Sequence, residues 1–431
     1  MRICFIQYQG HMYSGGQGVY LHYITRELAR RGHDVHVIAG VPYPEVAEDE
    51  GVRLHKLKTF SFWSYLDHFD EYAYRTHPLI FFHPVNLYEF ATSRFTLSSL
   101  LNMFSLRAYH KLNELERDAP FDLIHDNQTL GYGIWLMKLR PRPVVANIHH
   151  PLAIDRVNAL RQAKSLGAKV YAIFWYPWIM QRWVAVRLDK IITGSEASAQ
   201  SVAESFDLPR DHIRAIHDGV ETDVFRPLPE VEFEPNSVLF VGNSEDRNKG
   251  IRYLLEALRL LRSEVPFHLT IVHRPGSKGA PRLVQQLGLH GRVTFLERLS
   301  TRDLVEQYNR AQVLVSPSLY EGFGLPAAEA MACGTAVVTT TAGALSEIVE
   351  DGISGVLVPP GDVEALAGAI RTLIEDPERC RTMGAAGARR ARERFSWERT
   401  AEETIALYEE VLGRSIEPAP PPDLRRVEPV A

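Results

Sequence analysis

The sequence has little cysteine and no pattern of metal ligands. Its 431 residues contain three cysteines, Cys4, Cys333 and Cys380, which are odd in number and far apart. This spacing excludes a disulfide framework and favours reduced thiols. No Asp-X-Asp triplet and no carboxylate cluster with metal-ligand spacing is present. We therefore expect chemistry that uses neither a metal ion nor a cofactor.

Strong net charge and long apolar runs are missing as well. A net charge of −5 argues against a general nucleic-acid binder. No apolar run reaches the length needed to span a bilayer, and no internal repeat of fixed period is visible. The apolar segment Arg2–Gln7 opens the chain with no secretory signal before it. These features predict a cytoplasmic location.

Two aromatic segments each have more than one interpretation. Tyr43–Phe95 could line a pocket for a sugar face or an apolar acceptor, or could be an irregular insertion that packs on itself. Tyr171–Met180 is apolar for ten residues and contains Pro177. We favour a helix of an aromatic core or of an acceptor pocket. The flanking Arg182 and Arg187 also suit a surface anchor beside anionic lipid, which would place the protein peripherally at the inner face of a membrane.

The length of the chain predicts two domains. Each half alternates apolar strands with amphipathic helices, a pattern that predicts α/β domains with parallel sheets. Asp218–Pro229 is turn-rich and bounded by proline, so it suits a linker. We predict a first, acceptor-side Rossmann-like domain over residues 1–218, a second, donor-side one over 219–395, a final helix over 396–413 and a disordered tail over 414–431.

The stretch Val313–Thr341 predicts a strand, a glycine loop, a helix and a second strand. Its loop carries Gly322 and Gly324 at the carboxyl end of the first strand, where open α/β sheets bind ligands. Glu321 and Glu329 bracket the loop. Carboxylates accept hydrogen bonds from the hydroxyl groups of a sugar or a ribose, so the loop suits a polyol ligand.

The backbone of the same loop adds a second kind of contact. The N–H groups of Phe323–Leu325, at the start of the helix, suit a phosphate. A dinucleotide fingerprint is the competing interpretation, because Gly322–Ala327 matches G-x-G-x-x-A. Pro326 disturbs this fingerprint, and the next strand ends in Thr339–Thr341 instead of an acidic residue. The loop therefore predicts a nucleotide sugar.

Two loops of the first half also lie at predicted strand ends. Gly15 and Gly16 follow the first strand, and Gly16 could bring the backbone close to a phosphate. These glycines could equally serve a tight turn. His149 follows the predicted strand Val144–Ile148 and could hydrogen-bond a departing phosphate or a substrate hydroxyl.

In the second half, the loop after Ser237–Gly242 carries Arg247 and Lys249. These cations suit a diphosphate and the charge that grows on it as it leaves. If the two halves face each other, all these loops converge on one cleft. Glu321 and Glu329 superficially suggest a glycosidase pair. Because both carboxylates lie beside groups that suit a phosphate, we interpret them instead as ligands of the donor sugar and its ribose.

Six motifs, spread over most of the chain, match one family. SPSLYEGFGLPAAEAMACGTAVVTT contains E-x7-E, Gly15–Gly16 forms the N-terminal glycine loop, and VVANIHH is a strand ending in histidine. VGNSEDRNKG carries cations after a strand, HDGVETDVFRP forms a linker, and FSWERTAEETIALYEEVL a final helix. Together they resemble the retaining glycosyltransferases of the GT-B type, family 4. The resemblance implies two Rossmann-like, doubly wound domains that face across a cleft, with the last helix crossing back to the first domain.

The same resemblance implies an activity and roles for the candidate residues. The reaction would transfer a hexose from a nucleotide diphosphate sugar to an acceptor hydroxyl, without a metal and with retained α configuration. His149 and Glu321 would contact the transferred sugar, and Glu329 the donor ribose. Lys249 and Gly16 would bind the diphosphate. The acceptor stays open between a lipid-linked sugar, a polysaccharide and a small metabolite.

Two departures from the family pattern leave alternatives open. Asn243 stands where the family usually has arginine, so Arg247 has to replace that charge or Lys249 has to act alone. His273–Gly276 replaces a glycine-rich turn near the nucleotide base, which leaves the base undecided. A GT-B nucleotide-sugar epimerase or phosphorylase, and a non-catalytic nucleotide-sugar binding protein, remain the alternative functions.

Overall fold

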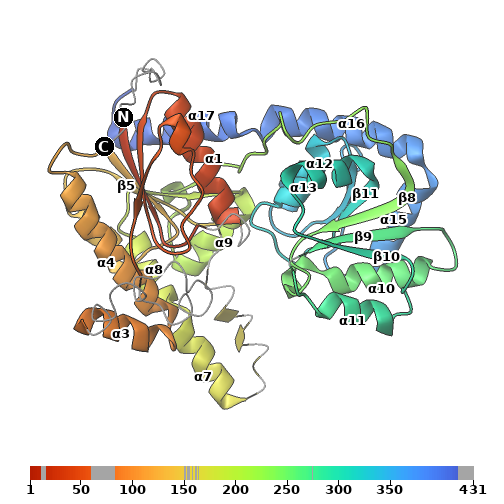
Figure 1. Cartoon of the computed structure of the whole chain (residues 1–431), viewed down its shortest axis with the longest axis horizontal. Coiled ribbons are helices and arrows are strands. Elements are labelled where there is room, and N and C mark those ends of the chain that lie inside the picture. The colour runs from red at the N-terminus through yellow and green to blue at the C-terminus, as the bar shows by residue number, and fades with distance from the viewer. Residues whose placement is uncertain are drawn as a thin grey trace. The chain divides into compact units, whose positions relative to one another are not determined.

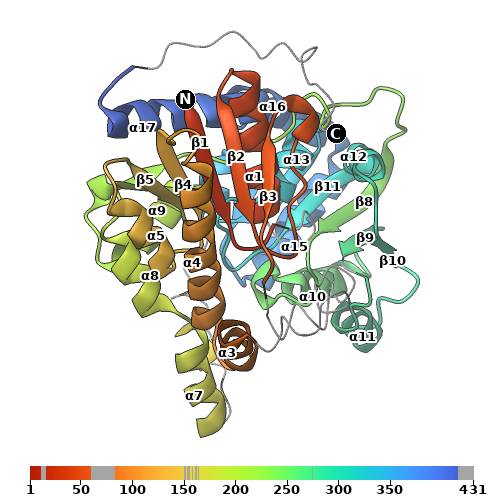
Figure 2. The ribbon, with the colours of Figure 1, turned by 60° about the vertical axis from the view of Figure 1, so that its left-hand side comes forward.

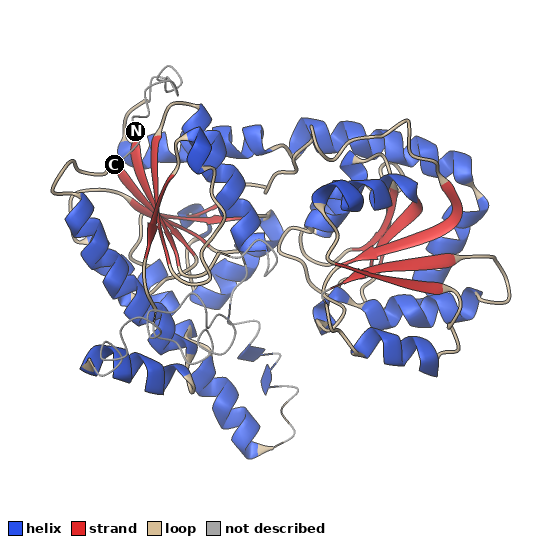
Figure 3. Cartoon of the chain, viewed as in Figure 1, coloured by secondary structure: helices blue, strands red, loops and turns tan. Residues whose placement is uncertain are grey.

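The computed structural model describes residues 1–10, 16–59, 83–149, 165–273 and 275–415, together with 152, 156–157, 159–160 and 163. The chain divides into two compact units. The N-terminal unit comprises Met1–Gly194, Ser198–Ile216 and Ala401–Ala431, and the C-terminal unit comprises Ser195–Ala197 and His217–Thr400. Each unit is built on one parallel sheet that is packed against helices (Figures 1 and 3).

In its described part, the N-terminal unit has a seven-stranded sheet with the order β3-β2-β1-β4-β5-β6-β7 and parallel neighbours throughout. The chain order changes direction between β1 and β4. The loops after these two strands therefore border the point where doubly wound sheets bind ligands. The strands are β1 Arg2–Gln7, β2 Asp34–Ala39, β3 Arg53–Lys56, β4 Leu123–Asn127, β5 Val144–Asn147, β6 Lys190–Thr193 and β7 Ile213–Ala215.

The sheet of the N-terminal unit is packed against helices (Figure 1). The described helices are α1 Gly16–Arg30, α3 Pro84–Ser93, α4 Leu97–Leu115, α5 Tyr132–Lys138, α7 Leu166–Trp175, α8 Trp178–Ala185 and α9 Glu196–Phe206. The last helix, α17 (Trp397–Leu412), belongs to the N-terminal unit from Ala401 onward. Its Tyr408 is fully buried there, with the hydroxyl 2.6 Å from Nδ1 of His125. This bond ties the end of α17 to β4.

In its described part, the C-terminal unit has a six-stranded parallel sheet with the order β10-β9-β8-β11-β12-β13. Here the chain order changes direction between β8 and β11. The loops that follow these two strands are consequently neighbours at one edge. The strands are β8 Glu234–Val241, β9 His268–His273, β10 Val293–Glu297, β11 Ala311–Ser316, β12 Ala336–Thr340 and β13 Val356–Val358.

Residues of the central strands alternate between two cores, as the period of a strand requires. Phe240, Val313 and Val315 pack with α10, α11 and α15, whereas Leu239 and Leu314 pack with α12, α13 and α14. Figure 1 shows α10 and α11 on one face of this sheet and α12 and α13 on the other. The helices are α10 Ile251–Leu261, α11 Gly279–Gln286, α12 Thr301–Arg310, α13 Leu325–Ala332, α14 Leu345–Ile348, α15 Val363–Glu375 and α16 Pro377–Arg394.

Some elements carry no clear signal in the sequence. The edge strands β3 and β7 are short and only partly buried, so they lack an apolar run. The helix α16 is rich in arginine and contains Gly384, which normally disfavours a helix. A Cβ at Gly384 would lie 1.9 Å from the carbonyl oxygen of Gly334. Glycine at this position therefore lets α16 approach the turn between α13 and β12.

The prediction of an aromatic core helix over Tyr171–Met180 is wrong. The segment is divided between α7 and α8, which separate at Tyr176 and Pro177. Tyr171, Phe174 and Ile179 are exposed, and Ala172 is the one buried residue of α7. Residues 60–82 of the other aromatic segment, and the tail from residue 416, lie outside the described residues.

Candidate functional site

The loop between β11 and α13 needs glycine at Gly324. This residue has φ of +107° and forms the N-cap of α13, with Pro326 in the first turn as expected. A Cβ there would also lie 2.7 Å from Cδ2 of Leu345. A side chain would therefore be strained and crowded at this turn. The loop delivers Glu321 and the N–H groups of Gly322–Leu325 to the carboxyl end of the sheet.

Lys249 and Glu321, predicted from different loops, are in direct contact. Nζ of Lys249 lies 2.6 Å from Oε1 of Glu321, and Oγ of Ser318 donates to the same oxygen at 2.9 Å. The loops lock together because Leu319 N donates to Asn248 O, and a Cβ at Gly250 would lie 1.9 Å from the carbonyl oxygen of Pro317. The side chain of Glu321 is 10% exposed and that of Lys249 is 27% exposed, so the cation keeps access to solvent.

Glu329 lies within α13 and is held by a tyrosine. The hydroxyl of Tyr308, on α12, donates to Oε2 of Glu329 at 2.7 Å. Burial raises the pKa of Glu329 to about 7, and the bond from Tyr308 counteracts part of that rise. Burial and the neighbouring carboxylate raise the pKa of Tyr308 well above its usual value. Tyr308 could not be identified from the sequence, because its helical spacing is that of an ordinary core residue.

The remaining predicted residues of this unit have differing surroundings. Oγ of Ser195 donates to Gly322 O at 2.8 Å, while the ring of Phe323 is buried against Phe395. The side chain of Phe323 is thus part of the core, and only its backbone remains a candidate for ligand contacts. Arg247 is exposed in the 3-10 helix η6 (Arg247–Lys249), two residues before Lys249.

The residues that follow β8 and β9, together with the last residues of β9 and β10, form a polar cluster at the same end of the sheet. Oγ of Ser244 lies 2.9 Å from Nδ1 of His273, whose Nε2 lies 3.5 Å from Oε1 of Glu297. Glu245 accepts hydrogen bonds from the N–H groups of Lys278 and Gly279, at 2.7 Å each. In the unusual turn His273–Gly276, residue 274 lies outside the described residues.

In the N-terminal unit, His149 sits in an uncharged network at the ends of β4 and β5. Its Nε2 lies 2.7 Å from Oδ1 of Asn127, and its N–H donates to Oε1 of Gln128 at 2.7 Å. The ring of Tyr20 meets the imidazole edge to face at 4.9 Å. Burial lowers the pKa of His149 to about 4, so the ring is neutral near pH 7. Since Oδ1 accepts, Nε2 carries the proton and Nδ1 is an acceptor.

The neighbours that orient His149 were not predicted. Asn127 at the end of β4 also donates to Oε1 of Gln7 and, at 3.3 Å, to Gln17 O. The next turn is held by Asp126, which accepts from the N–H groups of Thr129 and Leu130. Their place at strand ends is the signal that could have identified Gln7 and Asn127. Gly16 begins α1 directly after this edge, and Gly15 lies outside the described residues.

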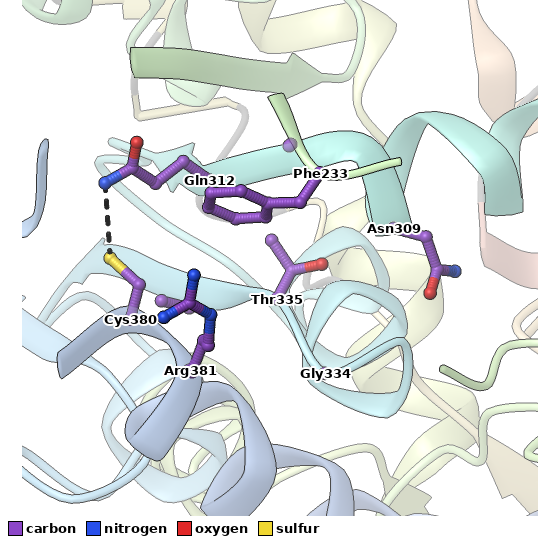
Figure 4. Close-up of a pocket in the computed structure, with 9 residues that line it drawn as sticks. Phe233, Asn309, Gln312, Gly334, Thr335, Cys380 and Arg381 are labelled. Carbon is purple, nitrogen blue, oxygen red and sulfur yellow. Dashed lines mark hydrogen bonds between the residues drawn. The ribbon is translucent and has the colours of Figure 1, made fainter. Parts of the chain in front are cut away.

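Two other features of the described chain do not form a reactive site. Among the described residues, no group of three or more His, Cys, Asp or Glu side chains could hold a metal ion. Figure 4 shows a small pocket of about 70 Å³ that Phe233, Gln312, Thr335 and Arg381 help to line. It lies at the amino ends of β11 and β12, opposite the predicted ligand edge. Its volume is far below the size of ordinary ligand pockets.

Comparisons with known proteins identify the class. The family model "Glycosyltransferase Family 4" matches residues 14–224, and "Glycosyl transferases group 1" matches residues 225–390. MMP alpha-(1->4)-mannosyltransferase of Mycolicibacterium hassiacum is 36% identical over 417 residues, covering 96% of this chain and 99% of the relative. D-inositol 3-phosphate glycosyltransferase of Mycobacterium bovis is 28% identical, covering 93% and 80% respectively.

Solved structures agree with this class. Sucrose-phosphate synthase from Thermosynechococcus elongatus superposes with a TM-score of 0.73 at 25% identity, over 96% of this chain and 99% of the other. HepE from Anabaena in complex with UDP gives a TM-score of 0.68 at 19% identity, over 95% and 100%. The chain belongs to the family 4 glycosyltransferases and has the α/β GT-B fold. Both parts of that prediction are confirmed.

Proposed function

We propose that this glycosyltransferase moves a hexose from a nucleoside diphosphate sugar to an acceptor hydroxyl, with retained α configuration and without a metal ion. The contact between Lys249 and Glu321 beside the N-terminus of α13 carries the proposal. One cation, one carboxylate and one helix N-terminus meet there. These groups suit a diphosphate joined to a polyol.

Each group has a distinct role in this proposal. Lys249 exchanges part of its contact with Glu321 for the diphosphate and stabilises the charge that develops as the diphosphate leaves. Glu321 accepts hydrogen bonds from hydroxyls of the transferred sugar. Glu329, oriented by Tyr308, accepts from the ribose hydroxyls. Nδ1 of neutral His149 accepts from a sugar hydroxyl. The contacts of Gly15, Gly16 and Arg247 with the diphosphate stay predictions.

The reaction needs no enzymatic base. The acceptor oxygen attacks the anomeric carbon on the face from which the diphosphate departs. A new C–O bond forms as the bond between the anomeric carbon and the phosphate oxygen breaks. The proton of the acceptor hydroxyl passes to the departing phosphate oxygen, and the electron pair of the broken bond stays on the diphosphate.

The relatives favour mannose as the hexose. The mannosyltransferase matches almost the whole chain in both directions, whereas the alpha-maltose-1-phosphate synthase of Mycolicibacterium smegmatis matches 61% of this chain at 32% identity. Thermal shift with GDP-mannose, UDP-glucose and related donors tests the choice, because a ligand that binds the folded state raises Tm. We expect the largest shift with GDP-mannose. If none of the tested nucleotide sugars raised Tm, donor binding would be refuted.

Turnover assays separate the alternatives. Incubation of the preferred donor with an acceptor panel should release nucleoside diphosphate only with a productive acceptor, and equally with EDTA present. NMR of the product should show an α linkage. An epimerised sugar product without acceptor would indicate an epimerase, a pyridoxal chromophore would indicate a phosphorylase, and tight binding without turnover would indicate a binding protein.

A further inference from the structure

Exposed apolar side chains gather on two helices of the N-terminal unit. Twelve of the eighteen large hydrophobic side chains exposed in the described chain fall within residues 83–95 and 156–188. Scattered single exposed hydrophobics are ordinary, but such a concentration marks an interaction surface. The most exposed are Leu166 at 79%, Phe174 at 69%, Ile179 at 67% and Phe95 at 63%.

The two helices are joined into one surface. Thr96, the N-cap of α4, donates from Oγ1 to the carbonyl oxygen of Phe174 at 2.8 Å. This bond places the end of α7 beside the α3–α4 turn, where Phe95 lies. Figures 1 and 2 both show α3 and α7 close together near one end of α4. We call this surface the α3–α7 face; it comprises Val85, Leu87, Tyr88, Phe95, Leu166, Val170, Tyr171, Ile173, Phe174 and Ile179.

The exposed charges within the described residues of the α3 and α7 segments are cations. The described residues between 156 and 188 include the cations Arg156, Lys169, Arg182 and Arg187 and no aspartate or glutamate; Arg182 is paired with the exposed Asp207. Residues 83–113 contain a single acid, Glu89, which is buried and paired with Arg107. Lys169 is exposed in the middle of α7, and Arg187 is exposed after α8. An apolar face flanked by cations is the arrangement by which helices lie on anionic membranes.

We propose that the α3–α7 face docks the protein on an anionic lipid surface, with the aromatic and aliphatic side chains entering the interface and the cations meeting lipid phosphates. A search of the described helices finds none with the length and hydropathy of a membrane span. A second copy of the chain fits less well. A two-fold dimer through this face would bring its cations together with no exposed acid in these segments to pair them.

Vesicle sedimentation of the full chain tests the proposal. We expect the protein to sediment with phosphatidylcholine vesicles that contain about 30 mol% phosphatidylglycerol and to stay in solution with phosphatidylcholine alone. Raising the salt to about 0.5 M should reduce binding, since screening weakens contacts between exposed charges. Absence of sedimentation with anionic vesicles, or equal binding to neutral ones, would overturn the proposal.

Two variants and a matched control assign the contact to this face. Phe174→Ser should lower the partition coefficient about tenfold, by removing one buried ring from the interface. Lys169→Glu should lower it about fivefold or more at low salt. Leu139→Ser changes a side chain that is also 63% exposed, in the same unit but outside the face, and should bind as wild type does. Equal losses in all three variants would overturn the assignment.

Light scattering tests whether a second copy of the chain occupies the α3–α7 face, and acceptor kinetics test whether the acceptor does. The Phe174→Ser variant should have the same oligomeric state as the wild type. Both face variants should have the acceptor KM of the wild type. A wild-type dimer that Phe174→Ser dissociates, without vesicle binding, would assign the face to a second copy instead. A raised acceptor KM in Phe174→Ser, without vesicle binding, would assign it to the acceptor.

Discussion

The two candidate clusters of this chain differ in charge. In the C-terminal unit the side chains are ionisable: Lys249 pairs with Glu321, and Glu329 is held by Tyr308. In the N-terminal unit the cluster consists of amides and a neutral imidazole, because burial holds the pKa of His149 near 4. Both clusters nevertheless lie at the carboxyl ends of parallel strands, next to the point where the sheet order reverses.

The difference matches the chemistry of a nucleotide sugar. A diphosphate carries charge, which a cation and a helix N-terminus stabilise, and this charge grows in the transition state. Sugar hydroxyls are neutral and need oriented donors and acceptors. We therefore expect substitutions in the first cluster to change transition-state charge stabilisation and substitutions in the second to change orientation.

The largest effect should follow from Lys249→Ala. It removes the cation and leaves the carboxylate of Glu321 beside the diphosphate. We expect kcat/KM to fall about 10²–10³-fold. Glu321→Ala should cost about 10²-fold, and the double variant should cost less than the product of the two, because the side chains are in contact. Donor-dependent nucleotide release measures all three. Normal turnover in both single variants would refute the site.

A smaller loss should follow in the uncharged cluster. His149→Ala should lower kcat by about 10²-fold, since it removes the acceptor Nδ1 and leaves Oδ1 of Asn127 without the donor Nε2. Asn127→Ala should cost less, about tenfold, because the imidazole remains but loses the group that fixes its tautomer. A salt titration sharpens the contrast: added salt should weaken donor binding through Lys249 and leave the His149 deficit unchanged. Equal salt responses would contradict the difference in charge.

Positions of the strands and of the loop residues could be predicted because they follow local rules. Buried parallel strands are apolar runs, so β1 and β11 stand out, and Gly324 and Pro326 mark the start of α13 by their backbone demands. The contact between Lys249 and Glu321 required the sheet order, which puts β8 beside β11. That order is a property of long-range packing, and only the family resemblance hinted at it.

The features that could not be predicted from the sequence have a common cause. Tyr308 and Asn127 act through another side chain, and their spacing is that of core residues. The exposure of α7 was mispredicted because an apolar run reports hydrophobicity and not what covers it. In both cases the missing information is the identity of the neighbour, which no local pattern contains.

A modest effect on the donor should follow from Tyr308→Phe. The hydroxyl of Tyr308 lowers the pKa of Glu329, which burial has raised to about 7. Without this bond the pKa of Glu329 should rise, so more of the carboxyl is protonated at pH 7 and accepts more weakly from the ribose hydroxyls than a carboxylate does. We expect donor KM to rise about fivefold, as for one hydrogen bond, and the acid limb of the KM profile to move to higher pH. If the pH dependence of the donor KM were the same in Tyr308→Phe and in the wild type, Glu329 would have no role in donor binding.

The smallest expected effect is the pH dependence of stability, which should differ between the two units. Buried histidines of the N-terminal unit have pKa values lowered to about 4 for His33, His55 and His149 and about 3 for His125. Because the unfolded chain binds more protons there, stability should fall as pH drops below about 6.5. Asp126 opposes this loss, because burial raises the pKa of its carboxyl to about 7 and the folded state therefore binds more protons at this group.

The C-terminal unit should respond in the opposite direction. Burial raises the pKa of Asp218 and of Glu329 to about 7, so the folded state binds more protons than the unfolded chain between about pH 4 and 7. Acidification from pH 7 to 5 should therefore stabilise this unit while the N-terminal unit loses stability. Hydrogen exchange, corrected for the intrinsic pH dependence of exchange, measures both units in one sample. The lowered pKa of His273 opposes part of the gain in the C-terminal unit. Parallel loss of protection in β4 and β11 would contradict the contrast, whereas earlier loss in β4 would follow from the larger number of histidines with lowered pKa values in its unit.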